Sequence, residues 1–229
     1  MKGDLLMSAF AQWLNTAFAG FDLAILQFYH DLAVAADPVV RPIMHFFSFI
    51  GDDGIFCFFL AAIFFLFPRT RRAGVALLIA IAIGAIFTNL TLKELIARPR
   101  PFNYDATFRS WWEYVGAPAQ GELSFPSGHV TSAAACMTAV CLSLRKKWYV
   151  ICPAVLYVLI MCAARNYLMV HYPTDVIGGI FVGALAGVIA FFLIRALWRY
   201  MEKHTDKAFC RFVICADIRN ISKKKTVEE

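Results

Sequence analysis

Residues 176–194 read VIGGIFVGALAGVIAFFLI and contain no charged residue. A helix needs about 20 mostly apolar residues to cross the hydrocarbon core of a bilayer. Residues 73–92, AGVALLIAIAIGAIFTNLTL, form a second such stretch, and shorter uncharged stretches cover 54–68, 130–144 and 148–164. We predict five membrane-spanning helices at these places. Because a backbone in lipid must satisfy its own hydrogen bonds, the predicted fold is all-α, an integral membrane helical bundle.

The composition of the whole chain agrees with this location. The chain has 229 residues, of which 60% are apolar and 17% are charged, whereas soluble domains have about 45–50% apolar and about 25% charged residues. These values exclude a disordered chain and argue against a water-soluble globule. A net charge of +6 in so apolar a chain is typical of basic residues that flank membrane spans. We therefore expect membrane lipids, and no nucleic acid, as partners.

The N-terminal segment 1–50 is more polar than the spans. It carries Asp22, Asp31 and Arg41 among its apolar residues, which favours an N-terminal amphipathic helix at the interface, followed by a short or tilted span. The bundle would then have five or six transmembrane helices. We expect three parts in the chain: this segment (1–50), a membrane-embedded core (51–199) and a polar cytoplasmic tail (200–229).

Basic residues predict the orientation of the bundle. If the five spans alternate, three basic clusters fall on one side, which the positive-inside rule makes the cytoplasmic side. The clusters are Arg69, Arg71 and Arg72; Arg145, Lys146 and Lys147; and Arg195, Arg199 and Lys203. The tail ends in Lys223, Lys224 and Lys225, which either touch anionic headgroups or are simply solvated.

Three polar segments lie at the predicted outer ends of the spans, where charged residues are costly and therefore informative. The first, residues 93–101, reads KELIARPRP. Its prolines turn the chain out of the helix, so Lys93, Arg98 and Arg100 gather at this turn. Taken alone, the segment is equally well explained by cations that reach toward lipid headgroups, and we expect Arg98 to face them.

The second and third segments open helices. Residues 124–129, SFPSGH, place Gly128 and His129 on a first turn, where free N–H groups form a seat for an anion. Residues 165–175, RNYLMVHYPTD, place His171 and Asp175 four residues apart, so the carboxylate can orient the imidazole. Each segment alone also fits a structural role, as a helix cap or a His–Asp contact.

Together the three segments supply two imidazoles, several cations and a helix N-terminus on one side of the membrane. Phosphoryl transfer needs these parts, namely cations for the equatorial oxygens, an in-line nucleophile and an acid for the leaving oxygen. The sequence offers no carboxylate cluster suited to Mg²⁺, so the cations would come from protein side chains.

The chain resembles the type-2 phosphatidic acid phosphatase family of integral-membrane lipid phosphatases, which have a six-helix core. The family motifs K-x6-R-P, P-S-G-H and S-R-x5-H-x3-D are matched in order and in spacing over about residues 56–193. The matching residues are Lys93, Arg100 and Pro101; Pro126, Ser127, Gly128 and His129; and Arg165, His171 and Asp175. The one departure is Ala164 in place of the family's Ser, which removes one hydroxyl that could bind phosphate.

The resemblance implies a role for each of these residues. His171 would attack phosphorus and become a phosphohistidine, Asp175 would orient it, and His129 would protonate the leaving oxygen. The substrate's phosphate would be held by Lys93, Arg100, Ser127, Gly128 and Arg165. No metal ion and no organic cofactor is implied.

The resemblance also implies a phosphate monoester or diphosphate lipid as substrate, in a bacterial cytoplasmic membrane with the site on the extracytoplasmic side. Undecaprenyl diphosphate is our first expectation. A phosphatidylglycerophosphate or phosphatidic acid phosphatase, and a lipid phosphotransferase, would use the same residues. From a different class, a transporter or a non-catalytic scaffold stays open, although a transporter more naturally carries its charges at mid-span. The oligomeric state is left open.

Overall fold

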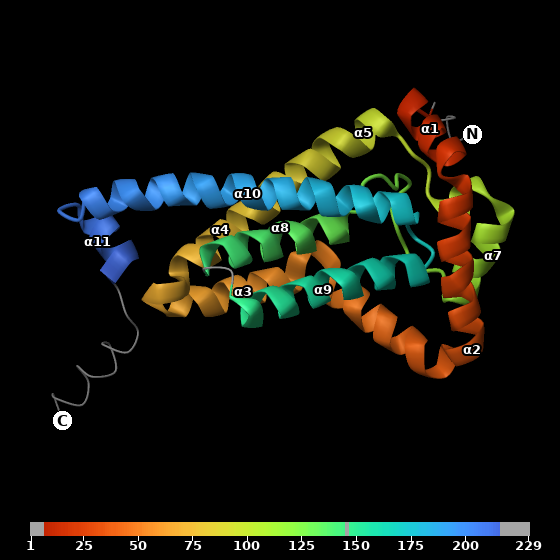
Figure 1. Cartoon of the computed structure of the whole chain (residues 1–229), viewed down its shortest axis with the longest axis horizontal. Coiled ribbons are helices and arrows are strands. Elements are labelled where there is room, and N and C mark those ends of the chain that lie inside the picture. The colour runs from red at the N-terminus through yellow and green to blue at the C-terminus, as the bar shows by residue number, and fades with distance from the viewer. Residues whose placement is uncertain (1–6, 145–146, 216–229) are drawn as a thin grey trace.

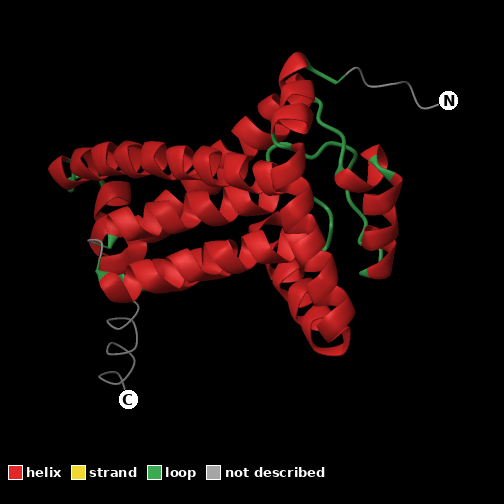
Figure 2. Cartoon of the chain, turned by 45° about the vertical axis from the view of Figure 1, so that its right-hand side comes forward, coloured by secondary structure: helices red, strands yellow, loops and turns green. Residues whose placement is uncertain are grey.

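The structure is a computed structural model that describes residues 7–144 and 147–215. Arg145, Lys146 and the three lysines at 223–225 therefore lie outside the described residues. Within those residues every regular element is a helix (Figure 2), which confirms the predicted all-helical fold.

In the described part of the chain, six apolar helices form the bundle, which Figure 1 shows from the side. Four are long and apolar enough to cross a membrane, namely α2 (Ala19–Gly51), the continuous helix Pro68–Ile96, α9 (Trp148–Tyr167) and α10 (Pro173–Lys203). Two shorter apolar helices, α3 (Ile55–Leu66) and α8 (Gly128–Ser143), complete the bundle. This number agrees with the predicted five or six spans.

The continuous helix changes its winding toward its C-terminal end. It consists of α4 (Pro68–Ala85), a π-helical stretch (Ile86–Leu92) and α5 (Lys93–Ile96). Four short helices lie outside the bundle: α1 (Ala9–Ala17), α6 (Pro101–Tyr104), α7 (Ala106–Tyr114) and α11 (Ala208–Cys215). Together with α1 and the first part of α2, helices α6 and α7 cover one end of the bundle (Figure 1).

Helix α2 is kinked. Ala36 has non-helical backbone angles (φ −136°, ψ 23°), and Pro38 follows two residues later, where it disfavours a continuous helix. The part before Ala36 crosses the end of the bundle, and the part after it slopes back along α9 (Figure 1). The N-terminal segment is therefore partly a cover for the bundle end and partly a sloping helix of the bundle.

Helix α8 lies at the centre and packs closely against α10. Three glycines of α10 at four-residue spacing face α8: Gly179, Gly183 and Gly187. A Cβ at Gly183 would collide with the Thr131 carbonyl oxygen and lie 2.8 Å from the Cβ of Ala134. Small residues let two helices approach this closely in a membrane. The approach fixes the N-termini of α8 and α10 beside each other.

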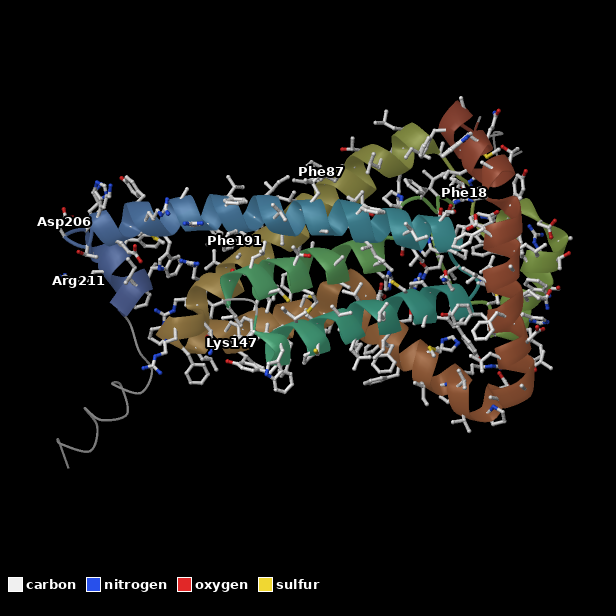
Figure 3. The ribbon with its side chains drawn as sticks, in the orientation of Figure 1. Phe18, Phe87, Lys147, Phe191, Asp206 and Arg211 are labelled. Atoms are coloured by element: carbon white, nitrogen blue, oxygen red, sulfur yellow. The ribbon has the colours of Figure 1, made fainter. Side chains whose placement is uncertain are left out.

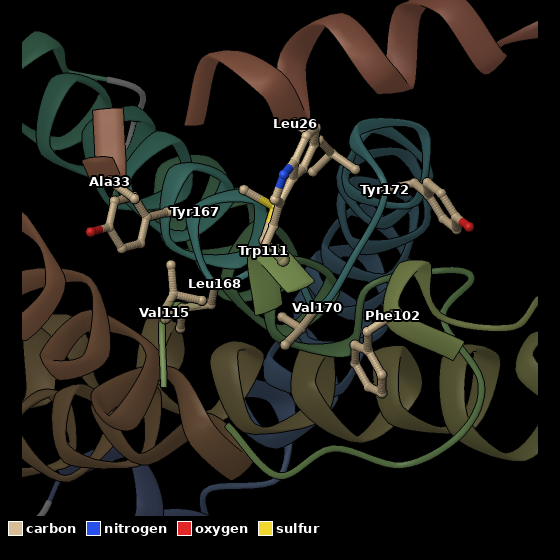
Figure 4. Close-up of a cluster of buried hydrophobic side chains, with 10 residues drawn as sticks. Leu26, Ala33, Phe102, Trp111, Val115, Tyr167, Leu168, Val170 and Tyr172 are labelled. Atoms are coloured by element: carbon tan, nitrogen blue, oxygen red, sulfur yellow. The ribbon is translucent and has the colours of Figure 1, made fainter. Parts of the chain in front are cut away.

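A buried apolar cluster joins the covering helices to the connection between α9 and α10 (Figure 4). Leu26 of α2, Phe102 of α6 and Trp111 of α7 pack with Leu168 and Val170 of that connection. Because each of these side chains is at most 8% exposed, the connection that carries His171 has little freedom to move.

The two ends of the bundle differ in the residues that they carry, and we call the end with Lys147 and Arg211 the basic end. Lys147, Asp206 and Arg211 lie at one end, and Phe18 lies at the other (Figure 3). At the basic end Arg71 is buried and donates through Nη1 to the Val213 carbonyl oxygen of α11 at 2.7 Å. The first part of the predicted polar tail is thus helical and packs against the bundle.

Candidate active site

A cavity of about 270 Å³ lies at the end of the bundle opposite the basic end. Five of the residues singled out in the sequence line it: Lys93, Arg100, Gly128, His129 and His171. The other three predicted site residues, Ser127, Arg165 and Asp175, are buried and contact the residues of its wall. Segments far apart in the chain therefore meet at one place, as the three sequence motifs predict.

One wall is a single stripe of the helix Pro68–Ile96. Ile81, Ala85, Asn89 and Lys93 all line the cavity, and they are four residues apart. The π-helical stretch Ile86–Leu92 widens the turn between Ala85 and Lys93, a feature often found at functional sites. The stripe changes from apolar to charged toward the C-terminal end of the helix.

Arg100 lies beside His171, the residue predicted to be the nucleophile. Its Nη1 donates to the Val170 carbonyl oxygen at 2.6 Å and lies 3.2 Å from Nε2 of His171. Its Nε donates to the Gly121 carbonyl oxygen. Burial lowers the pKa of Arg100 to about 10, and nearby Asp175 opposes this shift. The guanidinium is therefore still charged at neutral pH.

The second motif forms the N-terminus of α8 in the cavity wall. Ser127 is the N-cap, with extended backbone, and its N–H donates to the Asp175 carbonyl oxygen at 3.1 Å. A Cβ at Gly128 would lie 3.9 Å from Nζ of Lys93, an ordinary contact distance, so the start of α8 and the Lys93 ammonium are neighbours. The first N–H groups of α8 and the Lys93 ammonium thus face the same region, which suits an anion.

His129 lies between opposite charges. Its Nε2 is 3.4 Å from Nη1 of Arg165 and 3.5 Å from Oδ1 of Asp52. Arg165 is completely buried at the end of α9, where it donates to Ser48 Oγ at 2.6 Å and to Gln120 Oε1 at 2.7 Å. These two bonds fix the direction of its guanidinium toward the cavity.

His171 is 1% exposed and precedes α10. Its Nδ1 is 3.6 Å from Oδ2 of Asp175, and the same oxygen accepts the N–H of Tyr172 at 2.9 Å in a capping box. This distance exceeds that of a hydrogen bond, but catalytic hydrogen bonds often tighten only in the substrate complex. The arrangement directs Nε2 toward Arg100 and the cavity.

The pKa of His171 lies well below its usual 6.5. Burial is the largest cause, followed by the positive charges of Arg100, Arg165 and Lys93. The imidazole is therefore neutral at pH 7, and with a proton on Nδ1 it carries a lone pair on Nε2, which accepts from Nη1 of Arg100. A neutral imidazole beside three cations can attack a phosphorus atom whose oxygens those cations hold.

The expectation for Arg98 was wrong. Instead of facing headgroups it is 1% exposed and bridges Asp22 and Asp175. The physical reason is local, because Ala97 has left-handed backbone angles (φ 51°) that end α5 and turn the chain inward. The Arg98 carbonyl oxygen then accepts the N–H of Ser124 at 2.8 Å.

Sequence reasoning missed several polar residues of the site. Asp52, Asn89 and Gln120 line the cavity, and Ser48 holds Arg165. They belong to no motif and lie far from their partners in the chain. Ala164, which stands where the family motif has Ser, is completely buried. Within the described part of the chain, no three His, Cys, Asp or Glu residues are grouped so that they could hold a metal ion.

Comparisons with known proteins agree with the three motifs. The model of the PAP2 superfamily matches residues 73–201. The chain is 27% identical over 125 residues to an undecaprenyl-diphosphatase of Sulfolobus acidocaldarius, covering 55% of this chain and 57% of that protein. It is 31% identical over 128 residues to phosphatidylglycerophosphatase B of Bacillus subtilis, covering 52% of this chain and 55% of that protein. The chain thus spans just over half the length of both relatives.

A solved structure shares the fold. It is the transmembrane PAP2-type phosphatidylglycerolphosphate phosphatase of Bacillus subtilis, with a TM-score of 0.61, 24% identity, and coverage of 87% of this chain and 92% of that one. With the family model covering more than half of the chain and the three motifs placed around one cavity, the chain belongs to the PAP2 superfamily, as an integral membrane protein.

Proposed function

We propose that the protein is a lipid phosphatase that hydrolyses a phosphate monoester or diphosphate lipid through a phosphohistidine. The observation that carries the proposal is the cavity of about 270 Å³ in which two imidazoles meet Lys93 and Arg100, with Arg165 directly behind. Ligand pockets that enclose a whole small molecule are usually about 300–1,000 Å³. This cavity is sized for a headgroup, so the lipid tail would stay in the bilayer.

The lining of the cavity supports a lipid substrate. Ile81 and Ala85 line its inner part, and Asn89 and Lys93 continue the same stripe to the outer end. A lipid matches this order if the first carbons next to its phosphate lie against the apolar part and the rest of its tail stays in the bilayer. A soluble phosphate ester has no chain to place against the apolar part.

The first chemical step forms the phosphoenzyme. Nε2 of His171 attacks phosphorus while the bond from phosphorus to the leaving oxygen breaks. With a bound phosphate offsetting the positive charge of Arg165 beside it, His129 takes up a proton and gives it to that oxygen. Lys93, Arg100, Arg165 and the N–H groups of α8 stabilise the charge on the phosphoryl oxygens. Asp175 stabilises the positive imidazole formed at His171.

The second step releases phosphate. Neutral His129 takes a proton from a water molecule, whose oxygen attacks phosphorus. The phosphorus–nitrogen bond breaks and its electron pair returns to Nε2 of His171. The sum is hydrolysis of one phosphate bond, with both imidazoles restored.

Undecaprenyl diphosphate is the substrate we place first, in a bacterial cytoplasmic membrane. One relative carries the name undecaprenyl-diphosphatase and another phosphatidylglycerophosphatase B, so both lipids belong in the test. The second phosphate of a diphosphate would lie near Gln120 and the helix N-terminus of α8.

The test is phosphate release by purified protein in detergent from undecaprenyl diphosphate, phosphatidylglycerophosphate, phosphatidic acid and a lysophospholipid phosphate. We expect release from at least one lipid by the native protein and a fall of at least about 10⁴-fold in His171→Ala, the size found when a catalytic nucleophile is removed. Near-normal release by His171→Ala would refute the proposal. Release that requires an added acceptor lipid would favour a phosphotransferase.

A further inference from the structure

A chain of buried charges lies behind His171, on the side away from the cavity. Nη1 of Arg98 donates to Oδ1 of Asp175 at 2.6 Å, and its Nη2 donates to Oδ2 of Asp22 at 2.9 Å. The side chains of Arg98, Asp22 and Asp175 are at most 4% exposed. Asp22 belongs to α2, which lies outside the three sequence motifs.

Further contacts fix this cluster. Thr174 Oγ1 accepts from Nη1 of Arg98 at 2.6 Å and donates to Oδ2 of Asp22 at 2.8 Å. Nε of Arg98 donates to Asn15 Oδ1 at 2.8 Å, and its guanidinium lies 3.9 Å from the centre of the Tyr172 ring. All three nitrogens of the Arg98 guanidinium therefore donate a hydrogen bond. The contacts with Asp22 and Asp175 fix the orientation of its plane.

The charges of the cluster do not cancel. One guanidinium between two carboxylates leaves a net charge of −1. Arg98 paired with Asp175 alone would be neutral, and Asp175 would then offer little stabilisation to a positive imidazole. The charge of Asp22 restores the negative potential at Nδ1 of His171. This matters because three cations on the cavity side oppose positive charge on that ring.

We propose that Asp22 and Arg98 are positioning residues that hold Asp175 and keep the cluster behind His171 anionic while the phosphohistidine forms and breaks down. This inference rests on the proposed function. It also assigns a task to α2, since the helix that covers the bundle end supplies one of the charges behind the nucleophile.

A simpler role for Asp22 has to be separated from this one. Its Oδ1 accepts the N–H of Thr174 at 2.9 Å, so it also caps the first turn of α10. Asp22→Asn removes the charge and keeps an acceptor oxygen for that N–H. The matched control is Asp31→Asn, which alters an exposed carboxylate of the same helix whose partner is Gln27 at 2.8 Å.

Asp22→Asn should lower kcat by about 10- to 100-fold, the range found when the outer partner of an oriented, metal-bound histidine is removed. KM should change little, because the cations of the cavity are untouched. The acid limb of kcat/KM should move to lower pH, since loss of a negative charge makes His171 harder to protonate. Asp31→Asn should match the native protein in all three measurements.

The pH measurement must take the surrounding charges into account. Arg100 and Asp175 face His171 directly, and Lys93, Arg165 and His129 lie across the cavity. Asp22 is faced by Arg98, with Tyr104, Asp105 and Tyr172 around the same pocket of about 290 Å³. All of these are unchanged in Asp22→Asn, so a shift of the acid limb reports the charge of Asp22.

Arg98→Lys provides a second variant with a different expectation. It keeps the net charge of the cluster but cannot donate along two directions to the two carboxylates. It should lower kcat without moving the acid limb. This variant also keeps the inference testable if Asp22→Asn does not yield folded protein, as judged by its thermal unfolding in detergent.

His171→Ala in the same assay separates the two proposals. If it retains activity, the proposed function itself fails. If it is inactive while folded Asp22→Asn and Arg98→Lys keep the native kcat, only the inference is overturned. A rise in KM with unchanged kcat and an unchanged acid limb would likewise overturn it, because Asp22 would then be only a helix cap.

Discussion

At the scale of single residues, the site depends on keeping His171 neutral until it reacts. Burial and three cations disfavour its protonated form, and in the proposed mechanism the same cations bind the substrate's phosphate. A bound phosphate cancels part of that positive charge. Because attack on phosphorus makes the His171 ring positive, a bound phosphate lowers the electrostatic cost of that attack.

This environment predicts the pH dependence of the reaction. The pKa of His171 lies below 6.5, and the reactive form is the deprotonated one. Activity is therefore present above that lowered pKa and is lost as the pH falls through it. The acid limb of kcat/KM should lie below pH 6.5.

The measurement compares two lipid substrates whose phosphate groups differ in pKa, so that the limb common to both belongs to the enzyme. Arg100→Gln should move this limb to higher pH, because it removes a cation 3.2 Å from Nε2. A common limb at or above pH 6.5 in the native protein would contradict the assignment of His171.

The residue scale also shows where sequence reasoning succeeded and where it stopped. The spacing within each motif was enough to bring Lys93, His129 and His171 to one cavity, because each sits at a helix end whose position the spans determine. Arg98 was misjudged because its direction depends on the left-handed turn at Ala97. Its partner Asp22 lies 76 residues away in the chain, and no local pattern links the two.

At the scale of elements, the contact between α8 and α10 sets the geometry of the site. Ser127 and Gly128 open one helix and Asp175 lies in the first turn of the other. The Ser127 N–H bonds the Asp175 carbonyl oxygen. A shift between these two helices would therefore move the anion seat relative to His171.

This contact can be tested with Gly183→Ala. The added Cβ would meet the backbone of α8, which cannot move aside as a side chain can. We expect a loss of about 1–3 kcal/mol in the free energy of unfolding, typical of overpacking, although Gly→Ala within a helix is otherwise favourable by about 1 kcal/mol.

Gly20→Ala in α2 is the matched control, because no atom lies within 4 Å of its Cβ position. Thermal unfolding in one detergent should show a lower transition temperature for Gly183→Ala and an unchanged or higher one for Gly20→Ala. Equal stability of the two variants would mean that α8 and α10 pack less closely than described.

The elements also show what hydropathy alone can predict. The uncharged stretches at 73–92 and 148–164 correspond closely to helices, since length and composition decide them. The kink at Ala36 and the π-helical stretch Ile86–Leu92 were not predicted. The kink has a local cause in Pro38, which hydropathy does not register, and the π-helical stretch leaves no signal in hydropathy either.

At the scale of the whole molecule, the candidate active site and the basic clusters at the start of α4 and the end of α10 lie at opposite ends of the bundle. Lys147 and Arg211 lie near one end (Figure 3). His129 is on the first turn of α8 and His171 directly precedes α10, and both helices begin at the other end (Figure 1). The positive-inside rule predicts that the basic end faces the cytoplasm. The site would then open toward the extracytoplasmic side.

This orientation predicts the labelling of single cysteines introduced into a variant without native cysteines. A membrane-impermeant maleimide added to intact cells should label Ala119→Cys, an exposed position near the cavity, and should not label Lys207→Cys beyond α10. Both should react after the membrane is permeabilised. The reverse pattern in intact cells would place the site in the cytoplasm.

The central claim is that His171 carries the phosphoryl group during turnover, and rapid quenching with mass spectrometry tests it directly. The protein is mixed with a lipid that it hydrolyses and stopped with base, which preserves phosphohistidine. The predicted result is one phosphate on the peptide that contains His171, formed before free phosphate appears and missing in His171→Ala. Turnover with no phosphate on that peptide, or with phosphate on another residue, would contradict the account.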